Sequence, residues 1–411
     1  MQRKARSQCG PCTSPATRSL LQRADEKLPF TMSDEAPTRP VPVTAQWRPV
    51  TARLDRVAGP VFILPAVLVI LAFSIFPLLA SLYVSLTRLS FSEGGVQLTF
   101  VGLDNYAKLL VGIDQAHFLG VTRAITPISA AILAAIYAGF FYLLVRYARG
   151  RRRTAVGLVG RSLAALIAGA GVWLVVDTIL TSGRPGTLVV TIIYVGVDVT
   201  VQYFLALGLA LLVVQRLPGR RFFRVVFLLP MMITPVGVAY LFRMLTDTSK
   251  GPLYPLWTHF GLADVSWVTN PWGARLAVMI GDVWQWTPFI FIVLVAALES
   301  LPVELFEAAV VDGANRWQVF WEVTFPQILP ATSTVVLIRL IEAFKIVDLP
   351  NVLTNGGPGT ATESLTLHAY TIWRALDIGG SAAIAYMLLF VVTFIGITYV
   401  NLFRRRVVAA A

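Results

Sequence analysis

The sequence predicts an all-α polytopic membrane protein with about eight transmembrane helices. Of its 411 residues, 56% are hydrophobic and only 14% are charged, and the mean hydropathy is +0.71. Soluble globular domains carry roughly 25% charged residues, so the composition excludes that class. The apolar residues also form long uncharged runs. One run, 57–87, is longer than the roughly 20 residues that cross a bilayer core.

The apolar runs and the arginines between them predict a topology. The runs lie at residues 61–85, 127–145, 163–180, 188–214, 225–241, 276–298, 328–346 and 382–403. Because their number is even, both chain ends are expected on one side of the membrane. Arginines gather at 146–161, 216–224 and 404–406, so the positive-inside rule predicts cytoplasmic termini. The net charge of +12 is explained in the same way, without nucleic acid as a partner.

Polar tails flank the apolar runs. Residues 1–56 are rich in Pro, Arg, Thr and Ser without sustained periodicity, which predicts a disordered cytoplasmic tail. A second cytoplasmic tail is expected at 405–411. The first tail lacks the apolar core and cleavage site of a signal peptide. We expect Met32 to be the true start, because a more typical polar leader, MSDEAPTRP, begins there.

Cys9 and Cys12, the only cysteines, have the thioredoxin-type CxxC spacing in the sequence CGPC. No strand precedes the motif and no helical pattern follows it. A redox site needs that context, so a solvated tail is the favoured interpretation.

The polar segment 301–326, between the sixth and seventh runs, is predicted to fold as two short helices joined by a turn. Pro302 suits a first helical turn, and the positive end of the helix dipole favours the negative charge of Glu304. Gly313 then permits a tight reversal. Aromatic residues at three- and four-residue spacing give the second helix an aromatic face; they are Trp317, Phe320 and Trp321.

Two interpretations of this segment remain open from the residues alone. It is either a docking element for another protein or an interhelical loop whose aromatic residues lie on the membrane surface. Pro326 and Pro330 are expected to restart the chain into the next apolar run.

The same segment resembles the EAA loop of binding-protein-dependent ABC importer permeases. The matching residues are Glu307-Ala308-Ala309, then Gly313 after three intervening residues, then Val323-Thr324-Phe325-Pro326 after nine more intervening residues. The family usually has Ile and Leu where this chain has Val323 and Phe325. The fuller form ELFEAAVVDGANRWQVF is similar to the carbohydrate, maltose-type branch. The resemblance implies a coupling helix that sits in a cleft of a separate ATPase subunit. Its expected coupling residues are Glu307, Ala308, Ala309, Asp312, Gly313, Ala314, Trp317 and Phe320.

Other segments carry the same resemblance, most strongly over 208–406. They include GLDNY at 102–106, GRRFFRVVFLLP at 219–230 and LTNGGPGTATESL at 353–365. The resemblance implies a type I ABC importer permease-like core at 188–404, preceded by a first transmembrane helix and outer loop at 57–126. The usual carbohydrate permease has six spans, so the two at 127–187 form an extra transmembrane hairpin.

The resemblance also implies partners for this chain in a bacterial or archaeal plasma membrane. They are an ATPase subunit dimer, a second homologous permease subunit and an extracytoplasmic solute-binding protein. The loop residues expected to face the solute-binding protein are Asn355, Gly356, Gly357 and Pro358. No GxxxxGK[ST] loop occurs in the sequence, so ATP and Mg²⁺ are expected on the partner ATPase and no cofactor on this chain.

No catalytic or metal-binding constellation is visible in the sequence. The three histidines, His117, His259 and His368, fall in outer loops and lack metal-ligand spacing.

Polar residues inside the apolar runs are candidates for a substrate path. An ionisable group at the membrane centre costs about 2.5–3.5 kcal/mol on insertion scales and is by default functional. A sugar path needs groups that bind hydroxyls and an aromatic ring that covers the apolar sugar face. The candidates are Asp198, Gln202, Gln285, Trp286, Glu342 and Lys345. The alternative is internal pairing, of Glu342 with Arg339 or Lys345 and of Asp198 with Gln202.

These observations favour a permease subunit of an ATP-driven ABC importer for a sugar, oligosaccharide, polyol or sugar phosphate, working by alternating access. A stand-alone ion-coupled secondary transporter is the alternative. It predicts internal repeats, and the sequence contains no clear repeat. A polytopic membrane enzyme would need paired His, Asp or Ser groups near an interface, and no such cluster is visible.

Overall fold

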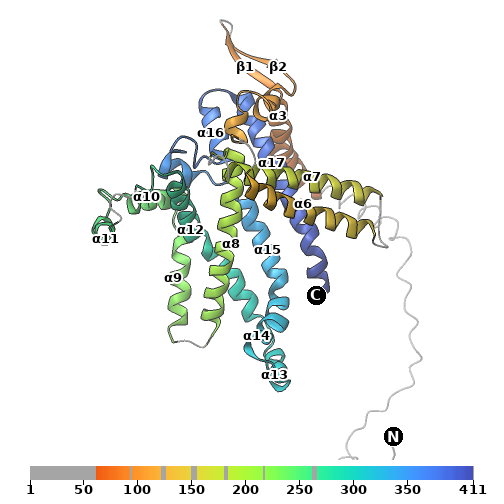
Figure 1. The fold of residues 1–411 in the computed structure, drawn as a ribbon, viewed down its shortest axis with the longest axis vertical. Helices are drawn as coiled ribbons and strands as arrows, with labels where there is room; N and C mark the ends of the chain where they lie inside the picture. Colours follow the sequence, from red (N-terminus) through yellow and green to blue (C-terminus); the bar gives the residue numbers. More distant parts are fainter. Residues whose placement is uncertain are drawn as a thin grey trace, which may run out of the picture. The chain divides into compact units, whose positions relative to one another are not determined.

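The computed structural model describes residues 62–92, 95–121, 126–149, 155–179, 184–215, 218–261 and 266–410 (Figure 1). The predicted tail 1–56, with its CGPC motif and Met32, lies outside these residues. The chain divides into two compact units, Met1–Ala72 and Phe73–Ala411. A first membrane helix, Phe62–Ser85, begins in the first unit and includes a π-helical turn, η1 (Leu71–Ile75).

The described residues contain seven helices that are long and apolar enough to cross a membrane, or eight if one sharply bent pair counts as a span. This confirms the prediction of about eight spans. The seven are Phe62–Ser85, Pro127–Ala148, Gly157–Asp177, Thr187–Val214, Pro271–Glu299, Arg316–Ala343 and Ile378–Phe403.

The predicted span 225–241 is not one helix. It is divided between α9 (Arg220–Met232) and α10 (Pro235–Leu245), which are bent by 96°. Pro235 disfavours helical backbone at the residue before it, and Thr234 is extended, with ψ of 144°. The Thr234 hydroxyl also accepts a hydrogen bond from the Gly237 N–H, which caps α10.

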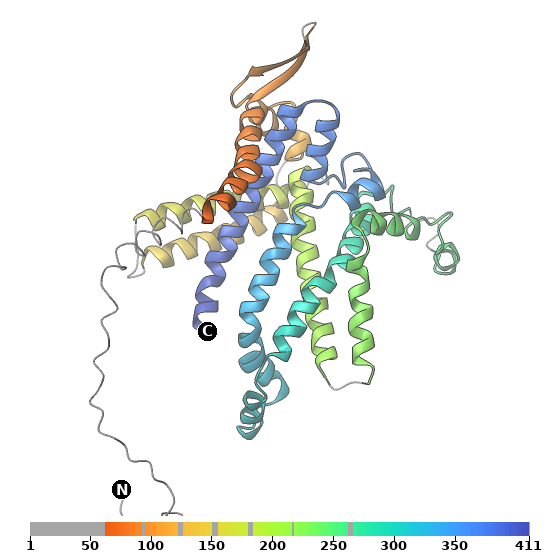
Figure 2. The same cartoon turned by 180° about the vertical axis from the view of Figure 1, so that it is seen from behind.

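Four long helices form the main body of the second unit. α12 (Pro271–Glu299) packs along α8 (Thr187–Val214), and α15 (Phe325–Ala343) contacts both of them. α17 (Ile378–Ala410) packs against α15 and against α3 (Phe76–Ser85) (Figures 1 and 2). Because α17 continues to Ala410, most of the predicted C-terminal tail, 405–411, is helical.

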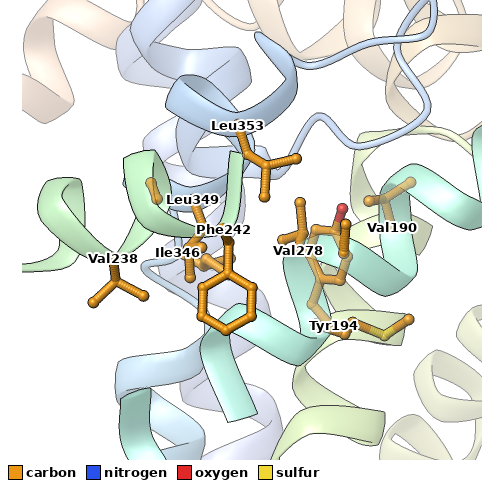
Figure 3. Close-up of a cluster of buried hydrophobic side chains, with 11 residues drawn as sticks. Val190, Tyr194, Val238, Phe242, Val278, Ile346, Leu349 and Leu353 are labelled. Atoms are coloured by element: carbon orange, nitrogen blue, oxygen red, sulfur yellow. The ribbon is translucent and has the colours of Figure 1, made fainter. Parts of the chain in front are cut away.

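A cluster of buried side chains holds the bent helix pair against this body. Phe242 of α10 lies among Tyr194 of α8, Val278 of α12 and Leu353 of η4 (Pro350–Thr354) (Figure 3). Lipid tails are as apolar as these side chains, so close packing rather than water exclusion favours the contact in a membrane. The cluster fixes α10 although its direction differs from that of α9.

The GLDNY motif caps the first membrane helix. Asn105, in α4 (Asp104–Leu110), is buried, and its amide donates to the Ser85 and Thr87 carbonyls, both at 2.9 Å. These carbonyls lie at the end of α3, where helical partners are missing. Between α3 and α4, β1 (Thr87–Ser92) and β2 (Gly95–Phe100) form an antiparallel hairpin that pairs Thr87 with Phe100.

The segment expected to form an extra hairpin contains two helices that pack on each other. They are α6 (Pro127–Ala148) and α7 (Ala155–Asp177), and the Tyr137 hydroxyl of α6 donates to the Gly169 carbonyl of α7 at 3.0 Å. An isolated bridge between Gly120 and Pro185 joins the segments on either side of the hairpin. The shorter helices are α5 (Gln115–Phe118), α11 (Tyr254–His259) and α16 (Leu365–Arg374).

Replacing Gly379 by Ala should destabilise the packing of α17. A Cβ there would lie 2.0 Å from the Thr87 carbonyl oxygen and 3.0 Å from the Asn105 amide nitrogen. Overpacking of this kind costs about 1–3 kcal/mol. We expect a lower melting temperature for the Gly379→Ala protein in detergent. Gly396→Ala is the matched control, because no atom lies within 4 Å of its added Cβ. Equal melting temperatures of the two variants would contradict this account of α17.

Candidate functional site

The predicted polar segment begins with a helix, α13 (Val303–Val311). A Schellman turn ends this helix. The Gly313 N–H donates to the Val310 carbonyl at 3.0 Å, and the Ala314 N–H donates to the Ala309 carbonyl at 2.9 Å. Gly313 has a φ of +77°, in the left-handed region that glycine adopts at low cost. The tight reversal expected at Gly313 is confirmed.

The second helix of the segment is not a separate short helix, which corrects the prediction. α14 (Arg316–Gln318) continues through the π-helical turn η3 (Val319–Thr324) into α15, so the helix is unbroken from Arg316 to Ala343. A proline ring clashes with the carbonyl four residues earlier in an α-helix, and the wider π turn accommodates Pro326. A capping box between Asn315 and Gln318 starts this helix.

Apolar and acidic side chains of this segment are exposed together. Val310 is 69% exposed and Val311 is 86% exposed, whereas Ala309 is buried inside the turn. Glu307, Ala308, Asp312 and Gly313 are also exposed, while Ala314 is half-buried. Figures 1 and 2 place α13 and α14 at the end of the helices where the turn between α8 and α9 lies. An exposed apolar knob rimmed by polar groups is typical of a protein interaction site.

The aromatic residues of the segment form one continuous cluster. The Trp317 and Trp321 rings stack at 6.3 Å, and the Phe320 ring meets the Trp321 ring at 5.0 Å. Trp317 is 70% exposed, but Phe320 is half-buried and packs against the core that α8 and α12 share. The aromatic face therefore joins the segment to the membrane helices.

A buried ion pair joins the three central helices. Arg339 of α15 pairs with Asp282 of α12, and both side chains are almost fully buried. Gln202 of α8 links them, because its side-chain oxygen accepts from Arg339 Nε at 2.8 Å and its amide donates to Asp282 Oδ2 at 2.9 Å. A buried charge is tolerated when it is paired and hydrogen-bonded. We call these three residues the clamp.

The clamp decides the pairings that the sequence left open. Arg339 pairs with Asp282 rather than with Glu342. Gln202 bonds to Asp282 and Arg339 rather than to Asp198. Asp198 is buried beside Asp282. Asp198 and Gln202 therefore line a closed helix contact in this state.

Three other candidates for the substrate path are more exposed than the clamp residues. The Trp286 ring is half-buried and covers the Arg339 guanidinium, with 5.0 Å from its Cζ to the ring centroid. Beyond it, Lys345 pairs with Glu342 at 2.7 Å, and their side chains are 58% and 37% exposed. Glu342 is in the last turn of α15, and Lys345 follows the end of this helix at Ala343. Charged groups avoid lipid, so we expect the pair to meet water or another subunit.

Gln285, the remaining path candidate, lies at the bend of the broken helix pair. Its amide donates to the Ile233 carbonyl at 3.3 Å, next to the break between α9 and α10. This bond satisfies a carbonyl that the end of α9 leaves free. Its side-chain oxygen is buried and has no hydrogen-bond partner in the described residues.

The loop 353–365, which was expected on the outer side from the sequence, is a closed turn held by hydrogen bonds from two helices. Asn355 and Gly356 both have positive φ, and Gly356 bonds to both ends of the turn, through the Pro350 carbonyl and the Thr362 N–H. Arg275 of α12 donates to the Ala361 carbonyl at 2.7 Å, and the Tyr194 hydroxyl of α8 donates to the Thr362 carbonyl at 3.2 Å. Asn355 is exposed, Gly356 is buried, and Gly357 and Pro358 are half-buried.

Two of the histidines lie together in the structure, a contact that the sequence gave no sign of. The rings of His117 in α5 and His368 in α16 stack at 4.1 Å, and His117 Nε2 bonds to Glu363 Oε2 at 2.6 Å. The hydrogen bond that His117 donates to the Glu363 carboxylate raises the pKa of His117. Burial and the neighbouring His117 lower the pKa of His368 to about 4. The described residues contain no group of three side chains able to hold a metal ion.

A family model matches residues 202–408, which are half of the chain. This range includes the clamp, the polar segment 301–326 with α13 (the α13 segment) and the loop 353–365. Its description is "Binding-protein-dependent transport system inner membrane component". The chain belongs to this family. The protein is therefore a multi-pass membrane permease component.

Known relatives match about half of the permease. The trehalose/maltose transport system permease protein MalF of Thermococcus litoralis is 33% identical over 217 residues, which are 53% of this chain and 74% of that protein. The trehalose transport system permease protein SugA of Mycobacterium tuberculosis is 32% identical over 216 residues, 53% of this chain and 69% of SugA. The probable starch degradation products permease AmyD of Thermoanaerobacterium thermosulfurigenes is 30% identical over 201 residues, 49% of this chain and 68% of AmyD.

A solved structure shares the fold of the permease. It is a chain from the crystal structure of a bacterial alginate ABC transporter in complex with an alginate pentasaccharide-bound periplasmic protein. The match has a TM-score of 0.55 at 18% identity and covers 88% of the permease and 98% of that chain.

Removing one member of the clamp should destabilise the permease more than removing both charges. Asp282→Leu leaves a buried guanidinium without its carboxylate, which costs about 3–5 kcal/mol. In the double variant Asp282→Leu/Arg339→Met neither charge remains, so we expect a melting temperature closer to that of the wild type. Melting curves in one detergent measure the difference. A double variant as unstable as the sum of the single variants would contradict a coupled pair.

The contact between His117 and Glu363 should weaken as the pH rises. Because the folded pKa of His117 is raised, its ionic contribution is complete below about pH 6.5 and is lost as the pH rises through the folded pKa. His117 is 35% exposed, so water screens the pair. We expect a coupling of about 1 kcal/mol at acid pH.

A double-mutant cycle of His117→Gln and Glu363→Gln measures this coupling from melting temperatures at about pH 6 and about pH 9.5. At the higher pH the imidazole is neutral, and only its hydrogen bond to the Glu363 carboxylate remains. The coupling should therefore fall to less than half. An equal coupling at both pH values would show that His117 is not charged in the folded permease.

Proposed function

We propose that this permease is the membrane-spanning subunit of an ATP-driven ABC importer for a sugar, oligosaccharide, polyol or sugar phosphate. The relatives named for trehalose, maltose and starch degradation products support this substrate class. The family model matches the half of the chain that contains the clamp and α13, where substrate and motor contacts are expected.

The observation that carries the coupling proposal is the construction of the α13 segment. Its exposed face combines Val310 and Val311 with Glu307 and Asp312, as a helix that docks in a cleft of an ATPase subunit requires. On one side it follows α12 through the short turn at Ser300, and on the other it leads without a break into α15. A force on α13 therefore acts on two spanning helices.

The clamp supports a movement of these helices as one body. Arg339 and Asp282 fix α15 to α12, and Gln202 adds α8. Closure of the ATPases would tilt this group of helices and open the path to alternate sides of the membrane. In this proposal Asp198 and Gln202 set the helix contact, and Trp286, Glu342 and Lys345 face the substrate.

The partners follow from the same proposal. An ATPase dimer would carry ATP and Mg²⁺, and a second homologous permease would cover the exposed face of Glu342 and Lys345. A solute-binding protein would deliver substrate at the outer loop, where Asn355, Gly356, Gly357 and Pro358 are held by Arg275 and Tyr194. Both termini would lie in the cytoplasm, on the same side as α13.

A stand-alone secondary transporter accounts less well for these observations. Such a protein needs no exposed apolar surface outside the membrane, and the exposed valines of α13 would then have no use. Membership of the binding-protein-dependent family also favours the importer.

The turn at Gly313 gives the experiment that tests the coupling role. A branched side chain at this positive φ costs roughly 1–2 kcal/mol, so Gly313→Val should reduce ATP-driven uptake about tenfold through loss of the docked turn. Gly313→Asn is the matched control, because asparagine tolerates the left-handed region. Its uptake should stay within about twofold of the wild type.

Uptake and ATPase activity are measured in proteoliposomes that contain the partner subunits. Both variants should insert into the membrane equally well, because no atom lies within 4 Å of a Cβ added at Gly313. Full uptake by the Gly313→Val transporter would remove α13 from the coupling role.

A further inference from the structure

A groove of about 500 Å³ lies between α8 and the helix that begins at Arg316. The wall on α8 is made by Tyr203, Phe204, Leu207 and Leu211. The facing wall is made by aromatic rings of α14, η3 and α15. Apart from Arg316, the lining side chains are aromatic or aliphatic. The groove is thus an apolar slot with one cation.

The groove runs along the membrane helices from a helix end towards the bilayer interior. Arg316 is in the first turn of its helix and Phe325 is nine residues farther on, which at 1.5 Å per residue is about 13 Å. On α8, Leu211 is near the C-terminal end at Val214, and Phe204 is about 10 Å deeper. The cation therefore marks the end of the slot nearest to water.

The side chains at this end are typical of a membrane–water interface. Trp317 and Trp321 are 70% and 53% exposed and stack on each other, and tryptophan is enriched at the level of lipid headgroups. Arg316 is exposed, and no carboxylate of the described residues forms an ion pair with it. Its charge is therefore available to an anion at the headgroup level.

We propose that this groove binds an anionic phospholipid, with an acyl chain between α8 and α15 and the phosphate on Arg316. Basic pockets between membrane helices bind the head groups of anionic lipids, and the aromatic walls suit an acyl chain. A peptide is a poor occupant, because the polar groups of the walls, which are the Tyr203 hydroxyl, two Trp N–H groups and Arg316, are too few to pair with its backbone. The same shortage would leave most hydroxyls of a sugar unpaired.

The bound lipid would brace the start of the helix that leads from α13 into the membrane. Phe320, Trp321 and Phe325 form one wall of the groove and also link the polar segment to α15. The binding site itself does not depend on the proposed transport role, so the two proposals are tested separately.

Native mass spectrometry of the assembled transporter tests the site. The complex is stripped of lipid in detergent and then given phosphatidylglycerol or phosphatidylcholine with identical acyl chains. We expect retention of phosphatidylglycerol, with a preference over phosphatidylcholine of about fivefold, since one arginine near an anionic lipid contributes about 1 kcal/mol. Arg316→Gln should abolish this preference and leave weak binding of both lipids.

Two pairs of variants separate this site from general lipid binding. Leu207→Trp fills the groove and should reduce retention of both lipids, whereas Leu212→Trp, at an exposed neighbour outside the groove, should not. Arg221→Gln, which removes another exposed arginine, should keep the preference for phosphatidylglycerol. Circular dichroism confirms that each variant is folded.

Three results would overturn the proposal. They are equal retention of the two lipids by the wild type, unchanged retention in the folded Leu207→Trp variant, and equal effects of Arg316→Gln and Arg221→Gln. A protein partner that shields the groove from lipid in the assembled transporter would give the first result.

Discussion

The buried pair of Arg339 and Asp282 is the interaction on which the arrangement of the central helices depends. Neither charge could stay in the membrane alone, because an unpaired ion there costs several kcal/mol. Each charge therefore requires the helix that carries the other, and Gln202 extends the requirement to α8. Close packing around Tyr194 and Phe242 then fixes the bent pair α9–α10 to the same body. The result is a helix group that one contact can move.

The α13 segment can transmit a force to the central helices because its own local structure is rigid. A Schellman turn ends α13, a capping box starts α14, and a π turn carries the helix past Pro326. None of these devices needs support from distant residues. The segment can therefore be exposed to a motor protein and still hold its shape, and the aromatic cluster of Trp317, Phe320 and Trp321 ties it to the membrane helices.

The sequence was informative where the signal is local. Long apolar runs predicted the spans, and Gly313 with its spacing predicted the turn. The prediction from sequence failed at the bend near Thr234 and at Pro326, because a proline has two possible effects on a helix. It can end the helix, as at Thr234, or the helix can continue past it through a π-helical turn, as at Pro326. The clamp and the stack of His117 on His368 join residues far apart in the chain. No pattern in a single sequence reports such pairs, so their partners came only from the structure.

The central claim is that α12 and α15 carry the motion of α13 as one rigid body. Spin labels at Val311, on α13, and at Thr269, just before the N-terminal end of α12, measure it by electron–electron double resonance in the assembled transporter. Both positions are exposed. The labelled transporter is first shown to hydrolyse ATP. The distribution of distances between the two labels should then be the same in its nucleotide-free and ATP-bound states. A shift of the distribution on ATP binding would show that α13 moves without α12, and would contradict the account.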